Sequence, residues 1–253
     1  MCLVVVAFGV HADYPLIVAG NRDEFHARPT REAQWWPDNA EIFGGRDLQA
    51  GGTWLALHRE GRFATVTNFR DAQQEPAGRK SRGELVTSFL EDHLAPLEYL
   101  ATIDENAYAG FNLFVSDGLE LAYMSNRGIA PSVLKSGIYG LSNATLDTPW
   151  SKVERSKNLM RKLVENDAIN EAALLRMLDD RNKGPLDEVE TGRLPFDKAH
   201  ALTSPFIVLP DYGTRSSSIV MCNSSGGWQF TERRFTANGT VSGETRQSVR
   251  VQE

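Results

Sequence analysis

Two short apolar runs at the start of the chain constrain its fold more than any other feature of the sequence. The first, LVVVAF, covers residues 3–8, and the second, LIVAGN, covers residues 16–21. An unbroken apolar run of this length, rich in β-branched residues, is typical of a strand that is buried on both faces. The intervening HADYP segment is rich in turn residues, so the two runs are predicted to form an antiparallel pair.

Further strand pairs are predicted along the rest of the chain. Residues 54–69 predict two strands around a Glu-Gly turn, and residues 110–126 predict a hairpin around an Asp-Gly turn. One further strand is predicted within residues 132–142. The last strands are predicted in SPFIVLP, SSSIVMCN and WQFTERRF.

Helix signals separate these strands. The sequence SRGE at residues 81–84 has the spacing of a capping box and precedes an apolar helical repeat. A second, short helix is predicted from Pro96. Later helices are predicted from the Thr-Pro pair at residues 148–149 and from Asn170. The charged segment 181–200 is predicted to be a surface loop.

The resulting order is strands, helices, strands, helices, strands, without a regular strand–helix–strand repeat. A doubly wound parallel sheet is therefore disfavoured, whereas two antiparallel sheets between two helix layers accommodate this order. We predict an α+β fold, a four-layer αββα sandwich, which residues 1–253 form as a single domain.

The charge and composition of the chain argue against several classes of partner. With 27 basic and 33 acidic side chains, the formal net charge is −6, which gives no electrostatic reason to expect nucleic acid or an anionic membrane. No stretch approaches the ~20 apolar residues of a transmembrane helix. The apolar N-terminus lacks the basic segment of a signal peptide. We therefore expect a cytoplasmic location and no transmembrane segment.

The cysteines and histidines have no pattern that is typical of a metal or haem site. The chain has two cysteines, Cys2 and Cys222, and five scattered histidines. Neither set has metal-ligand spacing, and no CxxCH sequence marks covalent haem attachment. We therefore expect neither a metal nor another cofactor.

Cys2 directly follows the first methionine, and two interpretations fit it. In one, it is a small apolar residue that begins a strand. In the other, Met1 is removed and the Cys2 thiol lies beside its own α-amine. An α-amine has a pKa of ~7.7–8.0 and can serve as an internal base for such a nucleophile. A thiol suits acyl transfer because the thiolate is strongly nucleophilic and its thioester is readily hydrolysed.

The sequence NRDE, residues 21–24, lies at the end of the second predicted strand. In an antiparallel pair this end meets the start of the first strand, so Asn21, Arg22 and Asp23 are expected close to Cys2. There, Asp23 can hold the α-amine, while Arg22 can lower the pKa of the thiol or bind a carboxylate of the acyl group. The alternative is that Arg22 and Asp23 pair only with each other.

Three more polar residues are candidates because of their context. Asn68 ends a predicted strand, and Asn143 precedes a predicted helix. The side-chain amide of either can donate to an oxyanion, although both positions also suit a turn or a cap. Arg215 begins a predicted strand among hydroxyl residues, where it can bind a carboxylate or lie on the surface.

Ten short motifs occur in an order that is known from one protein family. They are MC, NRDEF, GGTWLAL, TNF, RGELV, GFNL, YGLSN, TPW, YGTRS and FTER. From Met1 to about Phe235 the chain thereby resembles the NRDE family, also called the transport and Golgi organization 2 (TANGO2) family. That family looks like a branch of the N-terminal nucleophile (Ntn) hydrolases. It is most similar to their cysteine group, which contains penicillin V acylase and conjugated bile acid hydrolase.

The resemblance implies an αββα fold and a role for three of the candidates in the first half of the chain. By it, Cys2 is the nucleophile and Asp23 is the partner of its amine. Asn68 lines the oxyanion hole. One departure is that the acylases have an arginine before the asparagine of this motif, where this chain has Gly20, while Arg22 lies between the asparagine and the aspartate.

The resemblance also gives roles to the later candidates, and together the candidates predict a reaction class. It places Asn143 in the oxyanion hole, and Arg215 resembles a late arginine of the acylases. With Asn21 and Arg22 as further substrate contacts, we expect a hydrolase of a non-peptide C–N bond or another acyl bond in a small molecule. We expect the reaction to proceed through a Cys2 thioester. The alternative is a haem or acyl-lipid carrier on the same fold, without catalysis.

Overall fold

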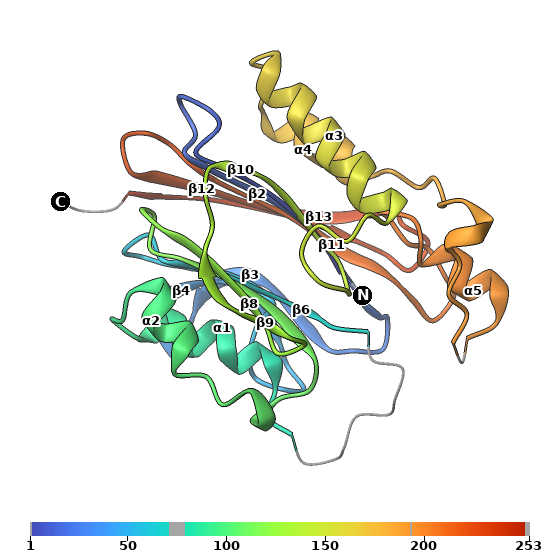
Figure 1. Ribbon diagram of the computed structural model, residues 1–253, viewed down its shortest axis with the longest axis horizontal. Helices are drawn as coiled ribbons and strands as arrows, with labels where there is room; N and C mark the ends of the chain where they lie inside the picture. Colours follow the sequence, from blue (N-terminus) through green and yellow to red (C-terminus); the bar gives the residue numbers. More distant parts are fainter. Residues whose placement is uncertain (1, 71–78, 193, 251–253) are drawn as a thin grey trace.

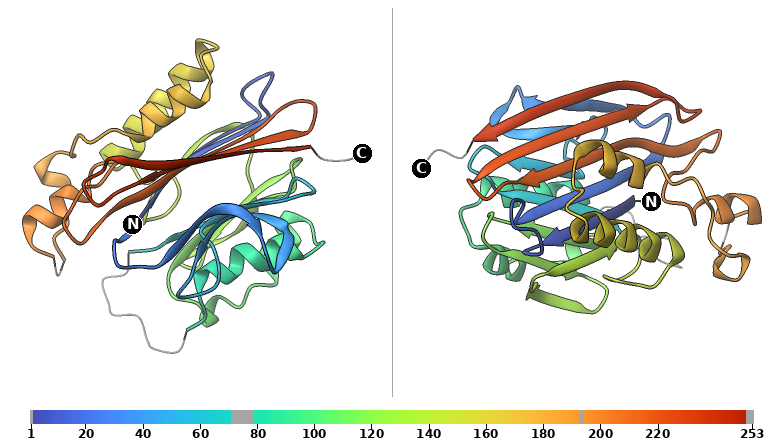
Figure 2. Two further views of the ribbon diagram at one scale, coloured as in Figure 1. Left: turned by 180° about the vertical axis from the view of Figure 1, so that it is seen from behind. Right: turned by 90° about the horizontal axis from the view of Figure 1, so that it is seen from above.

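The computed structural model describes residues 2–70, 79–192 and 194–250 of the chain. Two antiparallel sheets lie face to face, and a pair of helices covers the outer face of each (Figure 1). The left view of Figure 2 shows the same four layers from behind. The predicted four-layer αββα sandwich is therefore confirmed.

Within the described residues, the first sheet has six strands in the order β10-β1-β2-β11-β12-β13. Their bounds in chain order are β1 Cys2–Phe8, β2 Leu16–Phe25, β10 Gly137–Leu141, β11 Tyr212–Cys222, β12 Gly227–Phe235 and β13 Val241–Arg250. Strand β1 thus lies between β10 and β2. Val4 and Val6 face the core between the sheets, and Val5 and Ala7 face the helices on the other side. Burial of both faces explains why the sequence of β1 is a continuous apolar run.

The second sheet is a meander in which the seven described strands follow one another in chain order, from β3 to β9. Their bounds are β3 Thr30–Trp36, β4 Asn39–Asp47, β5 Leu55–His58, β6 Phe63–Asn68, β7 Phe111–Ser116, β8 Leu121–Ser125 and β9 Ile129–Val133. The predicted hairpins at 54–69 and 110–126 are therefore confirmed, as β5–β6 and β7–β8.

Two helices cover each sheet. Helices α1 (Arg82–Glu91) and α2 (Pro96–Ala101) pack on the second sheet. Helices α3 (Ser151–Glu165) and α4 (Glu171–Leu178) pack on the first. The short helix α5 (Phe196–Ala201) and the 3₁₀ turns η1 (Glu105–Ala107) and η2 (Leu186–Glu188) lie in connections.

Several strand predictions are wrong. Residues 132–142 form parts of two strands rather than one, because the chain leaves the second sheet after β9 and enters the first at β10. SPFIVLP forms no named strand; of its residues, Val208 makes an isolated bridge to Gly213. Strands β3, β4 and β13 have no counterpart in the sequence prediction, because polar residues and a Gly44-Gly45 pair interrupt their apolar pattern.

The helix caps also differ in part from the prediction. Asn170 caps α4 as expected, because its side chain accepts a hydrogen bond from the Ala173 N–H at 2.9 Å. Ser81 occupies the N-cap of α1, but its side chain makes no capping bond, and the carboxylate of Glu84 instead accepts from Lys80 at 2.9 Å. Helix α3 begins at Ser151 rather than at the Thr-Pro pair. The segment predicted as a surface loop contains η2 and most of α5.

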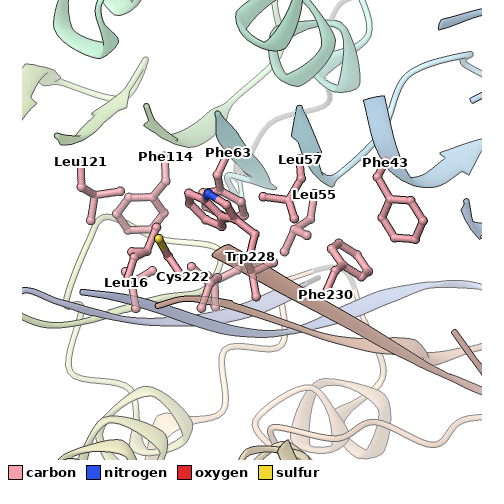
Figure 3. Close-up of a cluster of buried hydrophobic side chains, with 14 of the residues drawn as sticks. Leu16, Phe43, Leu55, Leu57, Phe63, Phe114, Leu121, Cys222, Trp228 and Phe230 are labelled. Atoms are coloured by element: carbon pink, nitrogen blue, oxygen red, sulfur yellow. The ribbon is translucent and has the colours of Figure 1, made fainter. Parts of the chain in front are cut away.

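The main core lies between the two sheets. Aromatic and aliphatic side chains from both inner faces interdigitate there, as Figure 3 shows. Phe43 from β4 and Phe230 from β12 meet edge to face across the gap, with ring centroids 5.1 Å apart. Two further clusters join each sheet to its own helices. The described helices include none that is long and apolar enough to cross a bilayer.

We predict that Phe230→Ala lowers the free energy of unfolding by about 3–5 kcal/mol, because it leaves a cavity between the sheets at a side chain that is 1% exposed. The matched control is Leu119→Ala, at a side chain that is 89% exposed, with an expected change within about 0.5 kcal/mol. Urea unfolding measures both. Equal losses in the two variants would contradict this description of the core.

Candidate active site

Cys2 is held at the start of β1 by hydrogen bonds on both sides of its backbone. Its N–H donates to Oδ1 of Asn143 at 3.3 Å, and its carbonyl oxygen accepts from Oγ of Ser142 at 2.7 Å. Both partners directly follow β10, which pairs with β1. The predicted pairing of β1 with β2 is confirmed, with Cys2 directly opposite Arg22. Directly opposed residues of an antiparallel pair project to the same face, so the thiol and the guanidinium are neighbours.

Asn143 is fixed by hydrogen bonds at its side chain and at its backbone oxygen. Its Nδ2 donates to the backbone oxygen of Asn68 at 2.7 Å, and its own backbone oxygen accepts from the Arg70 N–H at 2.7 Å. Because Nδ2 faces a carbonyl and Oδ1 faces an N–H, only one orientation of the amide satisfies both partners. Asn143 is therefore positioned with its acceptor on the Cys2 nitrogen, and one of its two amide protons is not used by the Asn68 carbonyl.

The two sheets meet at this point. Oγ1 of Thr67, at the end of β6, donates to the Ser142 backbone oxygen at 2.8 Å. The next residue, Asn68, is exposed and lines a cleft together with Cys2. The end of one sheet is thus joined by hydrogen bonds to the segment that follows β10 in the other. Ser142 and Thr67 were not predicted as site residues, because their role depends on the contact between the sheets.

Arg22 is a buried cation, 5% exposed, beside Cys2. Its guanidinium carbon lies 4.3 Å from the ring centroid of Trp54, in a cation–π arrangement. Its Nη2 lies 4.0 Å from Glu24 and 3.9 Å from Asp47, while its buried Nη1 has no hydrogen-bond partner among the described residues. The guanidinium thus stacks on the indole ring and makes no carboxylate contact shorter than 3.9 Å among the described residues.

Asp23 is 3% exposed and follows Arg22 on β2. Its Oδ1 accepts a hydrogen bond from Oγ1 of Thr214 at 2.7 Å, and its backbone oxygen accepts from the Tyr212 hydroxyl at 2.8 Å. Burial raises the pKa of the Asp23 carboxyl from 3.8 to about 6. The carboxyl group therefore titrates close to neutral pH.

The Cys2 thiol and the amine of Lys152 also have shifted pKa values. Burial raises the pKa of the Cys2 thiol, whereas the positive charge of Arg22 opposes that rise. Burial lowers the pKa of Lys152 to about 8, while the negative charge of Asp23 acts in the opposite direction. Lys152 lies in the first turn of α3, and its Nζ donates to the Leu202 backbone oxygen at 3.0 Å. No sequence pattern pointed to Lys152, since a lysine in a first helical turn is normally exposed.

A cleft of about 590 Å³ opens above these residues. Cys2, Arg22, Asp23 and Asn68 line it, and its walls also carry the side chains of Phe25, Arg28, Asp47, Trp54, Val66, Arg79, Lys80, Ser81 and Arg82. The cleft is therefore amphipathic, with five basic and three acidic side chains among its lining residues. It is large enough to admit a small molecule to the thiol.

Two of the predicted substrate contacts do not line this cleft. The Asn21 side chain is buried and donates to the Leu178 and Pro205 backbone oxygens, each at 2.9 Å. Nη1 of Arg215 donates to the backbone oxygens of Phe25 and His26, at 2.9 and 3.1 Å. Both side chains thus hold the ends of strands and turns beside the cleft. The alternation of strand residues places Asn21 on the opposite face from Arg22.

The group with the best spacing for a metal lies elsewhere. His11, Asp13 and Asp167 come close together beyond the far end of β1 from Cys2. However, Nδ1 of His11 accepts from the Asp13 N–H at 3.2 Å, and its Nε2 faces Asp167 at 3.2 Å. Both ring nitrogens are thus already engaged. No histidine belongs to the described residues that line the cleft.

Comparison with known proteins gives one family. A family model described as Transport and Golgi organisation 2 matches residues 1–237. The chain is 35% identical over 274 residues to the mouse "Transport and Golgi organization 2 homolog" and 35% identical over 269 residues to the human "Transport and Golgi organization protein 2 homolog". Each alignment covers 97% of both chains.

A solved structure shares the fold of this chain. A crystal structure of a mutant of the conjugated bile acid hydrolase from Clostridium perfringens has a TM-score of 0.57 and is 9% identical in sequence. The similarity covers 98% of this chain and 92% of that chain. At this identity the likeness concerns the fold alone.

The raised pKa of Asp23 predicts a pH-dependent cost in stability. An acid whose pKa is raised on folding binds its proton more tightly in the folded chain, so stability is lost as the pH rises from 3.8 to about 6. Asp23→Asn removes this loss and keeps an acceptor for Thr214. At pH 7 the substitution is expected to raise the free energy of unfolding by up to about 3 kcal/mol, with a much smaller gain at pH 4.

Urea unfolding at the two pH values measures this effect. The control is Asp187→Asn, at an exposed aspartate of η2, for which the expected change is within about 0.5 kcal/mol. A destabilised Asp23→Asn protein at pH 7 would contradict the prediction.

Proposed function

The chain belongs to the Transport and Golgi organisation 2 family, and on that premise we propose that it is an N-terminal-cysteine hydrolase of amide or other acyl bonds. The observation that carries the proposal is the position of Cys2. Cys2 lines a cleft of small-molecule size, and its nitrogen donates a hydrogen bond to Asn143. Arg22 and Asp23 flank Cys2. A cysteine that only begins a strand needs no such polar surroundings.

Removal of Met1, which lies outside the described residues, precedes the reaction. The nitrogen of Cys2 then becomes an α-amine, whose pKa of ~7.7–8.0 leaves part of it neutral at physiological pH. The amine donates a hydrogen bond to Oδ1 of Asn143, which turns the nitrogen lone pair away from Asn143. Asp23 supplies negative charge that stabilises the ammonium form after the amine has taken the thiol proton.

The thiolate sulfur then attacks the carbonyl carbon of the substrate, and the carbonyl π electrons move to oxygen. The unused amide proton of Asn143 and the exposed side chain of Asn68 donate to that oxyanion. As the oxyanion collapses, the bond from carbon to the leaving nitrogen or oxygen breaks, and the Cys2 ammonium protonates the leaving group. Cys2 is left as a thioester.

Hydrolysis of the thioester restores the enzyme. The neutral amine of Cys2 takes a proton from water, whose oxygen attacks the thioester carbon. The C–S bond breaks, the acyl group leaves as a carboxylic acid, and the thiol regains a proton from the ammonium. No group outside the chain and water is consumed. Asn143 therefore serves both the amine and the oxyanion in this proposal, whereas the sequence suggested only the oxyanion.

The first test is the intact mass of the purified protein before and after treatment with p-nitrophenyl acetate. We expect a chain that is lighter by one methionine residue and that, in a sample quenched during turnover, carries one acetyl group at Cys2. Cys222→Ala is the matched control, and it should still be acetylated, because Cys222 is buried between the sheets. A chain that keeps Met1 and is not acetylated would contradict the proposal. Copurified haem or acyl lipid would then support a carrier.

Cys2→Ala is expected to abolish turnover of acyl substrates, because the thioester cannot form. Alanine is as small as cysteine, so removal of Met1 should continue. The free energy of unfolding should change by less than about 1 kcal/mol, because residue 2 as a whole is only half-buried and the substitution removes a single heavy atom. Release of p-nitrophenol and urea unfolding measure the two quantities. Unchanged turnover in Cys2→Ala would contradict the assignment of Cys2 as the nucleophile.

Asn68→Ala is expected to lower kcat by about 10²–10³-fold with little effect on folding, since it removes an oxyanion donor from an exposed position. Ser81→Ala is the matched control, because Ser81 also lines the cleft and its side chain makes no capping bond. Steady-state kinetics with p-nitrophenyl acetate compares the two variants. Equally small decreases of kcat in the two variants would contradict a role of Asn68 as an oxyanion donor.

A further inference from the structure

The position of the Arg22 guanidinium is not explained by its ion pairs. Two carboxylates are near it, but the distances of 4.0 Å to Glu24 and 3.9 Å to Asp47 are too long for hydrogen bonds. A buried guanidinium gains most from short, bidentate contacts with carboxylates. Something therefore holds Arg22 short of the carboxylates and on the side of Cys2.

Trp54 is the side chain in that position. It comes from the second sheet, just before β5, and its indole ring lies 4.3 Å from the guanidinium carbon. The ring is itself fixed by close packing against Gly45 on β4. A Cβ atom at residue 45 would lie 2.4 Å from Cη2 and 2.7 Å from Cζ2 of the indole, so only glycine admits the ring there.

We infer that Trp54 is a positioning residue, which holds the positive charge of Arg22 beside the Cys2 thiol and thereby favours the thiolate. This inference rests on the proposed function, because it assigns a role to Trp54 in activating the Cys2 nucleophile. It explains why a cation of the first sheet is covered by a ring of the second. It also gives Gly45 a role, since it provides the space that the ring occupies.

The charged groups around Arg22 and Trp54 predict where the guanidinium moves when the indole ring is removed. Arg22 faces Glu24 and Asp47, and the charge of Arg215 also acts on it. Asp47 is already paired with Arg28 at 2.9 Å. Without the ring, the guanidinium can close the gap to either carboxylate and move away from the sulfur. The charges that still act on the thiol then include that of Asp23, which disfavours the thiolate, and that of Lys152.

The test is the rate at which iodoacetamide alkylates Cys2 between pH 5.5 and 9.5, read by peptide mass spectrometry. Trp54→Leu is expected to raise the pH midpoint of alkylation and to lower the rate at pH 7 about five- to tenfold. Trp54→Phe keeps an aromatic face and should give an intermediate midpoint. Arg22→Gln removes the charge itself and should shift the midpoint at least as far as Trp54→Leu.

Trp35→Leu is the matched control. Trp35 is also half-buried, and Arg59 lies 4.3 Å from its ring centroid, but neither residue lines the cleft. The pH midpoint of alkylation in Trp35→Leu should equal that of the chain without a substitution. The inference is overturned if Trp54→Leu or Arg22→Gln leaves the midpoint unchanged, or if Trp35→Leu shifts it equally.

Alkylation requires no turnover, so failure of this inference and failure of the proposed function are distinguishable. Hydrolysis with an unchanged midpoint in Trp54→Leu overturns the positioning role alone. A shifted midpoint in a chain that hydrolyses no acyl substrate overturns the proposed function alone.

Discussion

The antiparallel register of β1 and β2 is the constraint on which the site depends. It sets Cys2 opposite Arg22, and a shift of one residue would turn the side chains of one strand to the other face of the sheet. The register is fixed over seven paired residues by apolar side chains that are buried on both faces. The same pairs that form the core therefore aim the thiol and the guanidinium at the cleft.

Buried charge at the site has to be supported by the rest of the fold. Arg22, Asp23 and Lys152 are each at most 5% exposed, and burial of such groups costs free energy unless each is partnered. The shifted pKa values of Asp23 and Lys152 reflect that cost. The large apolar clusters between and outside the sheets offset it. Stability has thus been given up locally, at the point where groups that titrate near neutral pH are useful for proton transfer.

Much of the first half of the site could be predicted from the sequence. Apolar runs and turn residues define β1 and β2, and antiparallel geometry then brings Cys2, Arg22 and Asp23 together. Alternation along β2 could also have shown that Asn21 points away from Arg22. The roles of Trp54 and Lys152 could not be found in this way, because they depend on how one sheet and one helix pack against another sheet.

The strands that were missed have a related explanation. β3, β4 and β13 lie at or near the edges of their sheets, where polar residues are tolerated and the apolar alternation is weak. Arg215 was expected to bind a carboxylate, but strand β11 places its guanidinium against backbone carbonyls of the turn that follows β2. Such carbonyls leave no trace in a sequence pattern.

The bond between the Cys2 nitrogen and Asn143 joins residues that are 141 positions apart, and it forms only where β6, β1 and the segment after β10 meet. Closing so long a loop is entropically costly until the intervening sheet has folded and docked. A chain whose second sheet has not docked therefore lacks the contacts of Thr67 and Asn68 that complete the site. Reactivity of the thiol would then report on completed assembly of the whole sandwich, and a chain arrested before docking would carry a chemically ordinary cysteine.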